Sequence, residues 1–419
     1  MGGIALLVRK SLRQHALSTV VTVCSVALAS GLVMAVFAIS AQTRAAFVGG
    51  DPGFDAVLGA RGSQLQLVLN TVFHLETSPG NIPWSLYTQI KKDPRVDLAI
   101  PYALGDNYRG FRIVGTSEEI FTHFEVRKGE KFRLAGGGYF DGRRREAVLG
   151  SFAAAKTGLK PGDTFQPFHG LVFDEAQQHA EVYVVKGILQ PTNTPHDRVF
   201  WIPIEGIFRM GGHVLGQGTY EAKQGEEIPD EHKEVSAVMV RFKGGPGGGM
   251  AGYQLAQDIN RRGTVATLAW PIAAVLGEFF DKLGWMTRVL ELVAYLVVLV
   301  AMGAILASIY NTMNERRREF AILRALGARR TTVLSAIVAE AATISALGAL
   351  LGYAVYAAAL LGAGAAIRAQ TGVVLDLFAL HPVLLRAPLG MVLLGALAGI
   401  LPAMKAYATD VAENLTPAA

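Results

Sequence analysis

The chain has 419 residues, of which 51% are hydrophobic and only 17% are charged. Soluble globular domains carry about 25% charged residues, so this composition argues against an ordinary soluble enzyme. The formal net charge is +5, and the basic residues gather at the ends of apolar runs, which favours a membrane protein and argues against a nucleic-acid partner. The single cysteine, Cys24, excludes an intrachain disulfide framework, so a soluble part must be stable through its own core.

The first predicted element is a membrane span. No charged residue occurs from Ala16 to Ala41, and at about 1.5 Å per residue this run can cross ~30 Å of hydrocarbon as a helix. Arg9, Lys10 and Arg13 precede it, as in a cleaved signal peptide, but the run is longer than the roughly 7 to 15 residues of a signal core. We therefore expect a cytoplasmic N-terminus at 1–15 and an uncleaved first span at 16–41.

Residues 42–285 are typical of a soluble α+β domain. Strand-like runs occur at Phe111 to Val114, Glu181 to Ile188 and Val235 to Phe242, between Gly-rich turns and helical stretches. The tract from Lys243 to Met250 holds too many glycines for a regular element and lacks the spacing of a phosphate-binding loop. No Gly-x-x-x-x-Gly-Lys-Ser/Thr motif occurs anywhere in the chain, so we expect that ATP is not hydrolysed by this chain.

Seven of the nine histidines fall in this domain. Imidazole and carboxylate groups ligate zinc, and the group that offers both consists of His169, Asp174, Glu175 and His179. This zinc site is an alternative that we do not favour, because compact His-Glu-x-x-His spacing is absent and surface histidines are common. We assign no catalytic, cofactor-binding or metal-ligating residue and expect a non-catalytic membrane subunit.

Three more charge-free runs follow the domain, at Leu292 to Tyr310, Ala341 to Ile367 and Ala387 to Met404. Each is long enough, with its flanks, to span the membrane as a helix. The predicted segments are transmembrane helices at 286–313, 331–367 and 385–405, a cytoplasmic segment at 314–330, a short extracytoplasmic loop at 368–384 and a cytoplasmic tail at 406–419. The predicted fold is therefore a membrane α-helical protein with four spans in a 1 + 3 arrangement and one large extracytoplasmic α+β domain.

The connection between the second and third spans carries six arginines: Arg316, Arg317, Arg318, Arg324, Arg329 and Arg330. Short loops rich in Lys and Arg stay in the cytoplasm, as does the basic N-terminus. An even number of spans returns the C-terminus to the same side. We expect a multi-pass protein of the bacterial cytoplasmic membrane, with both termini in the cytoplasm.

The segment 314–330 reads NERRREFAILRALGARR. Its charged residues Glu315, Arg318 and Glu319 recur at helical spacing, and its apolar set is Phe320, Ile322, Leu323 and Leu326. The pattern predicts a short amphipathic helix that ends at Gly327. A helix between two spans suits docking to a cytoplasmic protein, although a basic loop resting on anionic lipid headgroups would have the same composition.

The string ERRREFAILRALGARRTTVLSAIVAEA resembles the signature between the second and third spans of MacB/FtsX-type permeases, also called type VII ABC permeases. The matching positions are Glu315, Arg316, Glu319, Arg324, Ala325, Leu326, Gly327 and Ala328, followed by Glu340 and Ala341. Phe320 stands where the family usually has Ile.

Near the end of the chain, Gly399, Pro402, Ala403 and residues 410–415 resemble the family's terminal segment, with Val411 in place of the usual Pro. Residues 145–165 resemble its periplasmic core domain, in which a helix leads to a Gly-Asp turn and a strand.

The resemblance implies that the segment 314–330 is a coupling helix that lies in a groove of a separate ATPase. The implied coupling residues are Glu315, Arg316, Glu319, Phe320, Leu323, Arg324, Leu326 and Gly327. The implied partners are a cytoplasmic ABC ATPase that binds ATP and Mg, a second permease chain (a homodimer in the simplest case), membrane lipid and a periplasmic adaptor or substrate-binding protein. The chain would transmit ATP-driven motion to its periplasmic domain for efflux or extraction of a lipoprotein, a peptide or another outer-leaflet substrate.

Two other functions stay open. An FtsX-like signalling protein that controls a cell-wall hydrolase without moving a substrate would carry the same connector. A membrane receptor that works without an ATPase is the third interpretation. The partner bound on each side of the membrane distinguishes the three.

Overall fold

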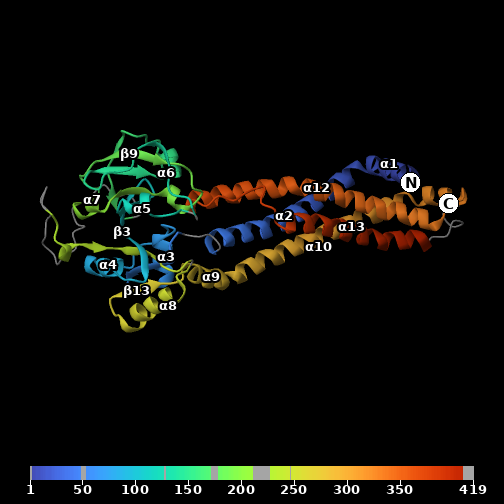
Figure 1. Cartoon of the computed structure of the whole chain (residues 1–419). Coiled ribbons are helices and arrows are strands. Elements are labelled where there is room, and N and C mark those ends of the chain that lie inside the picture. The colour runs from blue at the N-terminus through green and yellow to red at the C-terminus, as the bar shows by residue number, and fades with distance from the viewer. Residues whose placement is uncertain are drawn as a thin grey trace. The chain divides into compact units, whose positions relative to one another are not determined.

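The computed structural model of the chain describes residues 2–48, 53–126, 129–170, 178–210, 227–245 and 247–408. The chain divides into two compact units (Figure 1). The helical unit consists of Met1–Thr43, Leu283–Gly364 and Leu375–Ala419, and the α+β unit consists of Arg44–Lys282 and Ala365–Val374. Each unit has its own core.

The helical unit is built from the long helices at both ends of the sequence. They are α1 (Gly2–Gln14), α2 (Ala16–Val48), α10 (Gly284–Glu315), α11 (Arg317–Ala325), α12 (Arg330–Thr371) and α13 (Val383–Ala408). Among the described residues, α2, α10, α12 and the part of α13 up to Met404 are long and apolar enough to cross a membrane. The predicted 1 + 3 arrangement of four spans is therefore confirmed.

Small residues bring α2 and α12 close together. A Cβ atom placed on Gly352 would lie 2.9 Å from the Cβ of Ser30, and one placed on Gly31 would lie 2.7 Å from the carbonyl oxygen of Gly352. One turn earlier on α12, a Cβ on Gly348 would lie 2.5 Å from the Cβ of Val26. Glycines four residues apart on one face permit this backbone contact, which is a common way of packing helices in lipid.

The α+β unit contains short helices around a broad sheet. Its helices are α3 (Gln64–Thr71), α4 (Trp84–Lys91), α5 (Glu119–Thr122), α6 (Ser151–Thr157), α7 (Ile204–Phe208), α8 (Gly249–Gln257) and α9 (Ile272–Lys282). Its strands are β1 (Ala56–Ala60), β2 (Ile82–Pro83), β3 (Val96–Tyr108), β4 (Phe111–Thr116), β5 (Leu134–Gly137), β6 (Glu146–Leu149), β7 (Thr164–Phe165), β8 (Phe168–His169), β9 (Tyr183–Leu189), β10 (Phe200–Pro203), β11 (Glu234–Val235), β12 (Ala237–Phe242) and β13 (Ala266–Ala269). The predicted α+β class is confirmed.

Most strands join one mixed sheet. The order along it is β13-β1-β12-β3-β4-β10-β6-β9-β5, with β7 paired to β9 and β8 paired to β3, while β2 and β11 form a separate pair. Successive side chains of a strand point to opposite faces. In β10, Phe200 belongs to one hydrophobic cluster and its neighbour Trp201 to another, and both are fully buried. Both faces of the sheet are therefore covered, and β3 runs through its middle.

Two sequence-based expectations differ from the structure in detail. The strand expected at 235–242 is interrupted at Ser236, where the chain changes its partner from β2 to β3. The Ser236 hydroxyl accepts a hydrogen bond from Leu104 N at 3.0 Å and so holds the chain at this change. The glycine tract was expected to hold no regular element, but α8 begins at Gly249, and Asp55 Oδ1 accepts a 2.6 Å hydrogen bond from Gly247 N just before it.

A histidine in the core of the α+β unit makes the domain sensitive to acid. His196 is 6% exposed and meets Phe124 and Phe132 edge-on, with ring centroids 5.4 and 5.6 Å away. Burial lowers its pKa from 6.5 to about 4. Because the folded pKa is depressed, the unfolded chain binds more protons below pH 6.5, and stability falls as pH falls from 6.5 through about 4. The full loss is about 3 kcal/mol.

We predict that His196→Gln will remove this part of the acid sensitivity. Unfolding of the full chain in detergent, followed by tryptophan fluorescence between pH 7 and 4, should show a loss smaller by about 3 kcal/mol than in the unmodified chain. A residual slope is expected from His74, whose pKa is held below its ordinary value mainly by burial and then by His196. The exposed His123→Gln is the control. Equal acid sensitivity in the His196 variant and the unmodified chain would contradict the prediction.

Candidate functional site

The connector between α10 and α12 contains a short separate helix, α11. The chain turns at Arg316, whose backbone angles (φ −100°, ψ 11°) interrupt the helix between α10 and α11. At the other end Gly327 has φ +97°, a conformation that glycine adopts without strain. The N–H groups of Gly327 and Ala328 donate to the carbonyls of Arg324 and Leu323, both at 3.0 Å, which closes the last turn.

The apolar residues of α11 divide between two faces. Phe320 and Ala321 are 9% and 6% exposed and face the helical bundle, and Leu323 is half-buried against the same core. Ile322 and Leu326 are 45% and 80% exposed. Their spacing of four residues places them on one outer face, and such exposed apolar side chains in a basic segment are typical of a protein-binding surface.

A buried arginine ties α11 to the rest of the bundle. The Arg316 side chain is 7% exposed, and its Nε donates to Glu319 Oε2 at 2.9 Å. Its Nη1 lies 3.7 Å from Glu340 Oε2 on α12, and its guanidinium lies 5.0 Å from the ring centroid of Phe320. The other carboxylate oxygen of Glu340 accepts a 2.6 Å hydrogen bond from Ser11 of α1. The connector, α12 and α1 therefore share one polar cluster.

A second group of contacts joins the start of α2 to α10. His15, between α1 and α2, places Nδ1 3.1 Å from Glu315 Oε2 at the end of α10. Beside it, Ser18 and Ser308 place their hydroxyl oxygens 2.9 Å apart. Sequence reasoning missed Ser11 and His15, because the only signal at these positions was a pair of polar residues at the start of an apolar run.

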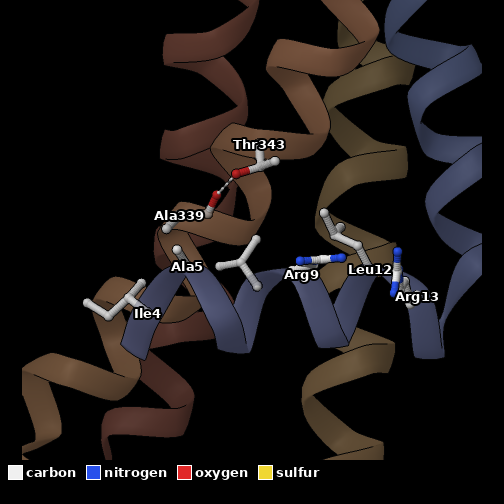
Figure 2. A pocket seen from close by; sticks show the side chains of 8 residues that line it. Ile4, Ala5, Arg9, Leu12, Arg13, Ala339 and Thr343 are labelled. Atoms are coloured by element: carbon white, nitrogen blue, oxygen red, sulfur yellow. Dashed lines mark hydrogen bonds between the residues drawn. The ribbon is translucent and has the colours of Figure 1, made fainter. Parts of the chain in front are cut away.

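Helix α1 lies against α12 beside this cluster and leaves a groove of about 660 Å³ (Figure 2). Its lining is apolar apart from Arg9, Arg13 and Thr343, and the Thr343 hydroxyl donates to the Ala339 carbonyl at 2.6 Å. The apolar lining residues from α1 are Ile4, Ala5, Val8 and Leu12. The helix buries Val8 and Ser11, which fixes its orientation on the bundle.

Residues 19–245, more than half of the chain, match the family described as MacB-like periplasmic core domain. The chain belongs to the MacB/FtsX-type ABC permeases. Residues 291–411, which include α11, match the family described as FtsX-like permease C-terminal. The resemblance seen in the connector is thus confirmed, and the permease is a multi-pass membrane subunit of an ABC transporter, a class that works with a partner ATPase.

Two solved structures are similar to parts of the permease. The periplasmic region of MacB from Actinobacillus actinomycetemcomitans is 11% identical, with a TM-score of 0.33, over 55% of this chain and 94% of that one. The extracellular domain of the noncanonic ABC-type transporter YknZ from Gram-positive bacteria is 15% identical, with a TM-score of 0.30, over 51% and 97%. No curated protein matches the sequence of the permease significantly.

The structure brings only some of the eight expected coupling residues together. Arg316 and Phe320 are buried together, the exposed Glu319 accepts a hydrogen bond from Arg316, and Glu315 pairs with His15 outside this group. Leu326 and Gly327 are exposed at the end of the connector, while Leu323 and Arg324 are half-buried. Of the eight residues, Glu315, Glu319, Leu326 and Gly327 are therefore exposed, while Arg316 and Phe320 are buried.

A third group of side chains lies in the α+β unit, at the edge of β8. Asp106 is fully buried and its Oδ1 lies 3.3 Å from both His169 Nδ1 and His179 Nε2. The hydrogen bond with Asp106 raises the pKa of His169 above its ordinary value. Both histidines belong to the group considered from the sequence as a zinc site, whereas Asp174 and Glu175 lie outside the described residues. Imidazole and carboxylate at these distances can hold a metal ion.

Proposed function

We propose that the permease couples ATP hydrolysis by a separate cytoplasmic ATPase to motion of its α+β domain outside the membrane. In this proposal α11 is the coupling helix, the partner binds ATP and Mg²⁺, and the permease holds neither. The observation that carries the proposal is the outward face of α11, where Ile322 and Leu326 are exposed although apolar. Neighbouring arginines suit an acidic rim on the partner.

The polar cluster supports a mechanical role for α11. A helix that only rested on lipid headgroups would not need a buried arginine joined to another span. Arg316 contacts Glu319 next to the docking face and Glu340 on α12. A displacement of α11 by the partner would therefore act directly on α12.

Long unbroken helices can carry such a displacement. Helix α2 has 33 residues and α12 has 42, more than the roughly 20 residues needed to cross a membrane. Residues at the end of each helix, 44–48 and 365–371, are grouped with the α+β unit. Rigid-body motion of such helices is a common form of conformational switching.

The arginines of the connector support its position in the cytoplasm. With the connector inside, both termini are inside as well, and the α+β domain faces the periplasm or the cell exterior. We propose the bacterial cytoplasmic membrane as the location, a homodimer as the assembly, and a lipoprotein, a peptide or another outer-leaflet molecule as the substrate. A periplasmic adaptor or substrate-binding protein is a further partner.

The test is purification of the tagged permease from its native host in mild detergent, with mass spectrometry and an ATP-hydrolysis assay on the eluate. The expected result is an ABC ATPase at a ratio of one to one and measurable hydrolysis. A co-eluting cell-wall hydrolase or its adaptor would instead identify a signalling protein of the FtsX type. A permease that elutes alone and inactive would overturn the proposal and favour a receptor.

A further inference from the structure

The backbone around Asp106 holds two histidines near one carboxylate. In β8, His169 is paired with Asp106 of β3, and the N–H of Gly170 donates to the carbonyl of Gly105 at 3.0 Å. The backbone at His179 is fixed as well, since its N–H donates to the carbonyl of Pro167 at 2.9 Å. Main-chain hydrogen bonds therefore position all three side chains.

An irregularity in β3 makes room for this arrangement. The register of β3 against β4 shifts between Leu104 and Asn107, which is the stretch where β8 joins β3. Bulges of this kind redirect side chains and occur often beside functional sites. The shift places the carboxylate of Asp106 in the interior, at 0% exposure.

The distances fit ligands of one metal ion better than they fit two ion pairs. Charge-assisted hydrogen bonds between nitrogen and a carboxylate are about 2.7–2.9 Å long, whereas both imidazole nitrogens lie 3.3 Å from Asp106 Oδ1. Two ligand atoms at about 2.0–2.1 Å from one tetrahedral zinc ion lie about 3.3–3.4 Å apart. All three ligand atoms lie within 4.8 Å of one another, a spacing from which one ion can be approached by each of them.

We propose that Asp106, His169 and His179 bind a divalent transition-metal ion in the α+β domain, with zinc as the probe ion. Two imidazoles and one carboxylate suit zinc and its neighbours, whereas calcium and magnesium prefer oxygen ligands alone. Three protein ligands leave one coordination position open for water or another group, whereas structural zinc sites have four protein ligands. The proposal is independent of the coupling role of α11.

The charges around the group are compatible with a cation. Arg112 is a positive side chain that interacts with Asp106, and its Nη2 donates to the carbonyl of Glu76 at 2.8 Å. One donor of the guanidinium is thus used by a main-chain oxygen. With neutral imidazoles the three ligands carry one negative charge, which a divalent ion over-compensates by one unit.

The test uses the full-length permease in detergent, with an affinity tag that contains no histidine, after removal of metals by a chelator. At pH 7.5, equilibrium dialysis against Zn²⁺ should show one tightly bound ion per chain, and Co²⁺ should give the visible absorption of a four-coordinate site. Because loss of an outer-shell partner already costs about 10–100-fold in metal affinity, His169→Ala should weaken binding at least roughly 100-fold. His169 is exposed enough for this variant to fold.

Two variants complete the test. Asp106→Asn keeps the shape of the side chain while removing the charge, and it should also abolish the Co²⁺ spectrum. His123→Ala removes an exposed histidine of the same domain and should leave binding unchanged. Equal binding by the unmodified chain, His169→Ala and Asp106→Asn would overturn the proposal, as would the absence of tight binding in the unmodified chain. Co-purification of the ATPase, measured on the same preparations, reports the coupling function separately.

Discussion

Replacing Ile322 and Leu326 together with Asp should abolish binding of the ATPase while the permease still inserts in the membrane. Ile322 lies on α11 and Leu326 directly follows its last turn, and both side chains are exposed, at 45% and 80%, so the free permease loses little by the change. In the complex each would be buried, and burial of one such side chain contributes about 1.5–3 kcal/mol. Two introduced charges add a desolvation cost, so affinity should fall by more than roughly 100-fold.

Co-purification with the ATPase and the hydrolysis rate of the eluate measure the effect. The control is Thr331→Asp, an exposed polar position in the first turn of α12, where an acidic residue is well tolerated. An unchanged yield of ATPase with the double variant would show that this face is not the docking surface. Leu323→Asp would be a poorer test, although Leu323 is among the expected coupling residues, because Leu323 packs partly on the bundle core and its loss would disturb the bundle as well.

The four spans and the existence of the connector helix could be predicted because each depends on local sequence. A charge-free run of about 20 residues favours a helix in lipid, because a helix satisfies its backbone hydrogen bonds within the segment. Gly327 ends the connector helix for an equally local reason, its positive φ. The side of α11 that faces outward was less predictable, since Ile322, Leu323 and Leu326 look alike in sequence and only the packing of the bundle separates them.

The polar clusters could not be predicted, because their members come from distant parts of the chain. Ser11 and Glu340 are 329 residues apart, and Asp106 lies 63 and 73 residues before the two histidines that it contacts. Proximity in sequence drew attention to Asp174 and Glu175 instead. Pairing of β8 with β3 is what brings Asp106 to the histidines, and no short-range pattern specifies that pairing.

Arg316→Met should destabilise the helical unit by about 3–5 kcal/mol, because it leaves the buried Glu340 carboxylate without its cationic partner. Both side chains are less than 10% exposed, so water cannot replace the lost contact readily. The effect is measured as the fraction of permease that stays soluble in detergent after heating. Arg317→Met, at an exposed neighbouring position, is the control and should be almost neutral. Equal losses for the two variants would contradict the prediction.

The double variant Arg316→Met/Glu340→Met separates stability from coupling. Replacing both members of a buried ion pair with apolar residues is often neutral, so the double variant should recover most of the stability lost in Arg316→Met. It should still bind the ATPase, because Ile322 and Leu326 are unchanged. If the pair transmits displacement of α11 to α12, the purified complex should still hydrolyse ATP but should lack the conformational response of the α+β domain. That response is measured as a change in cross-linking of the α+β domain when nucleotide is added. A normal response in this stable double variant would show that α11 acts on α12 by packing alone.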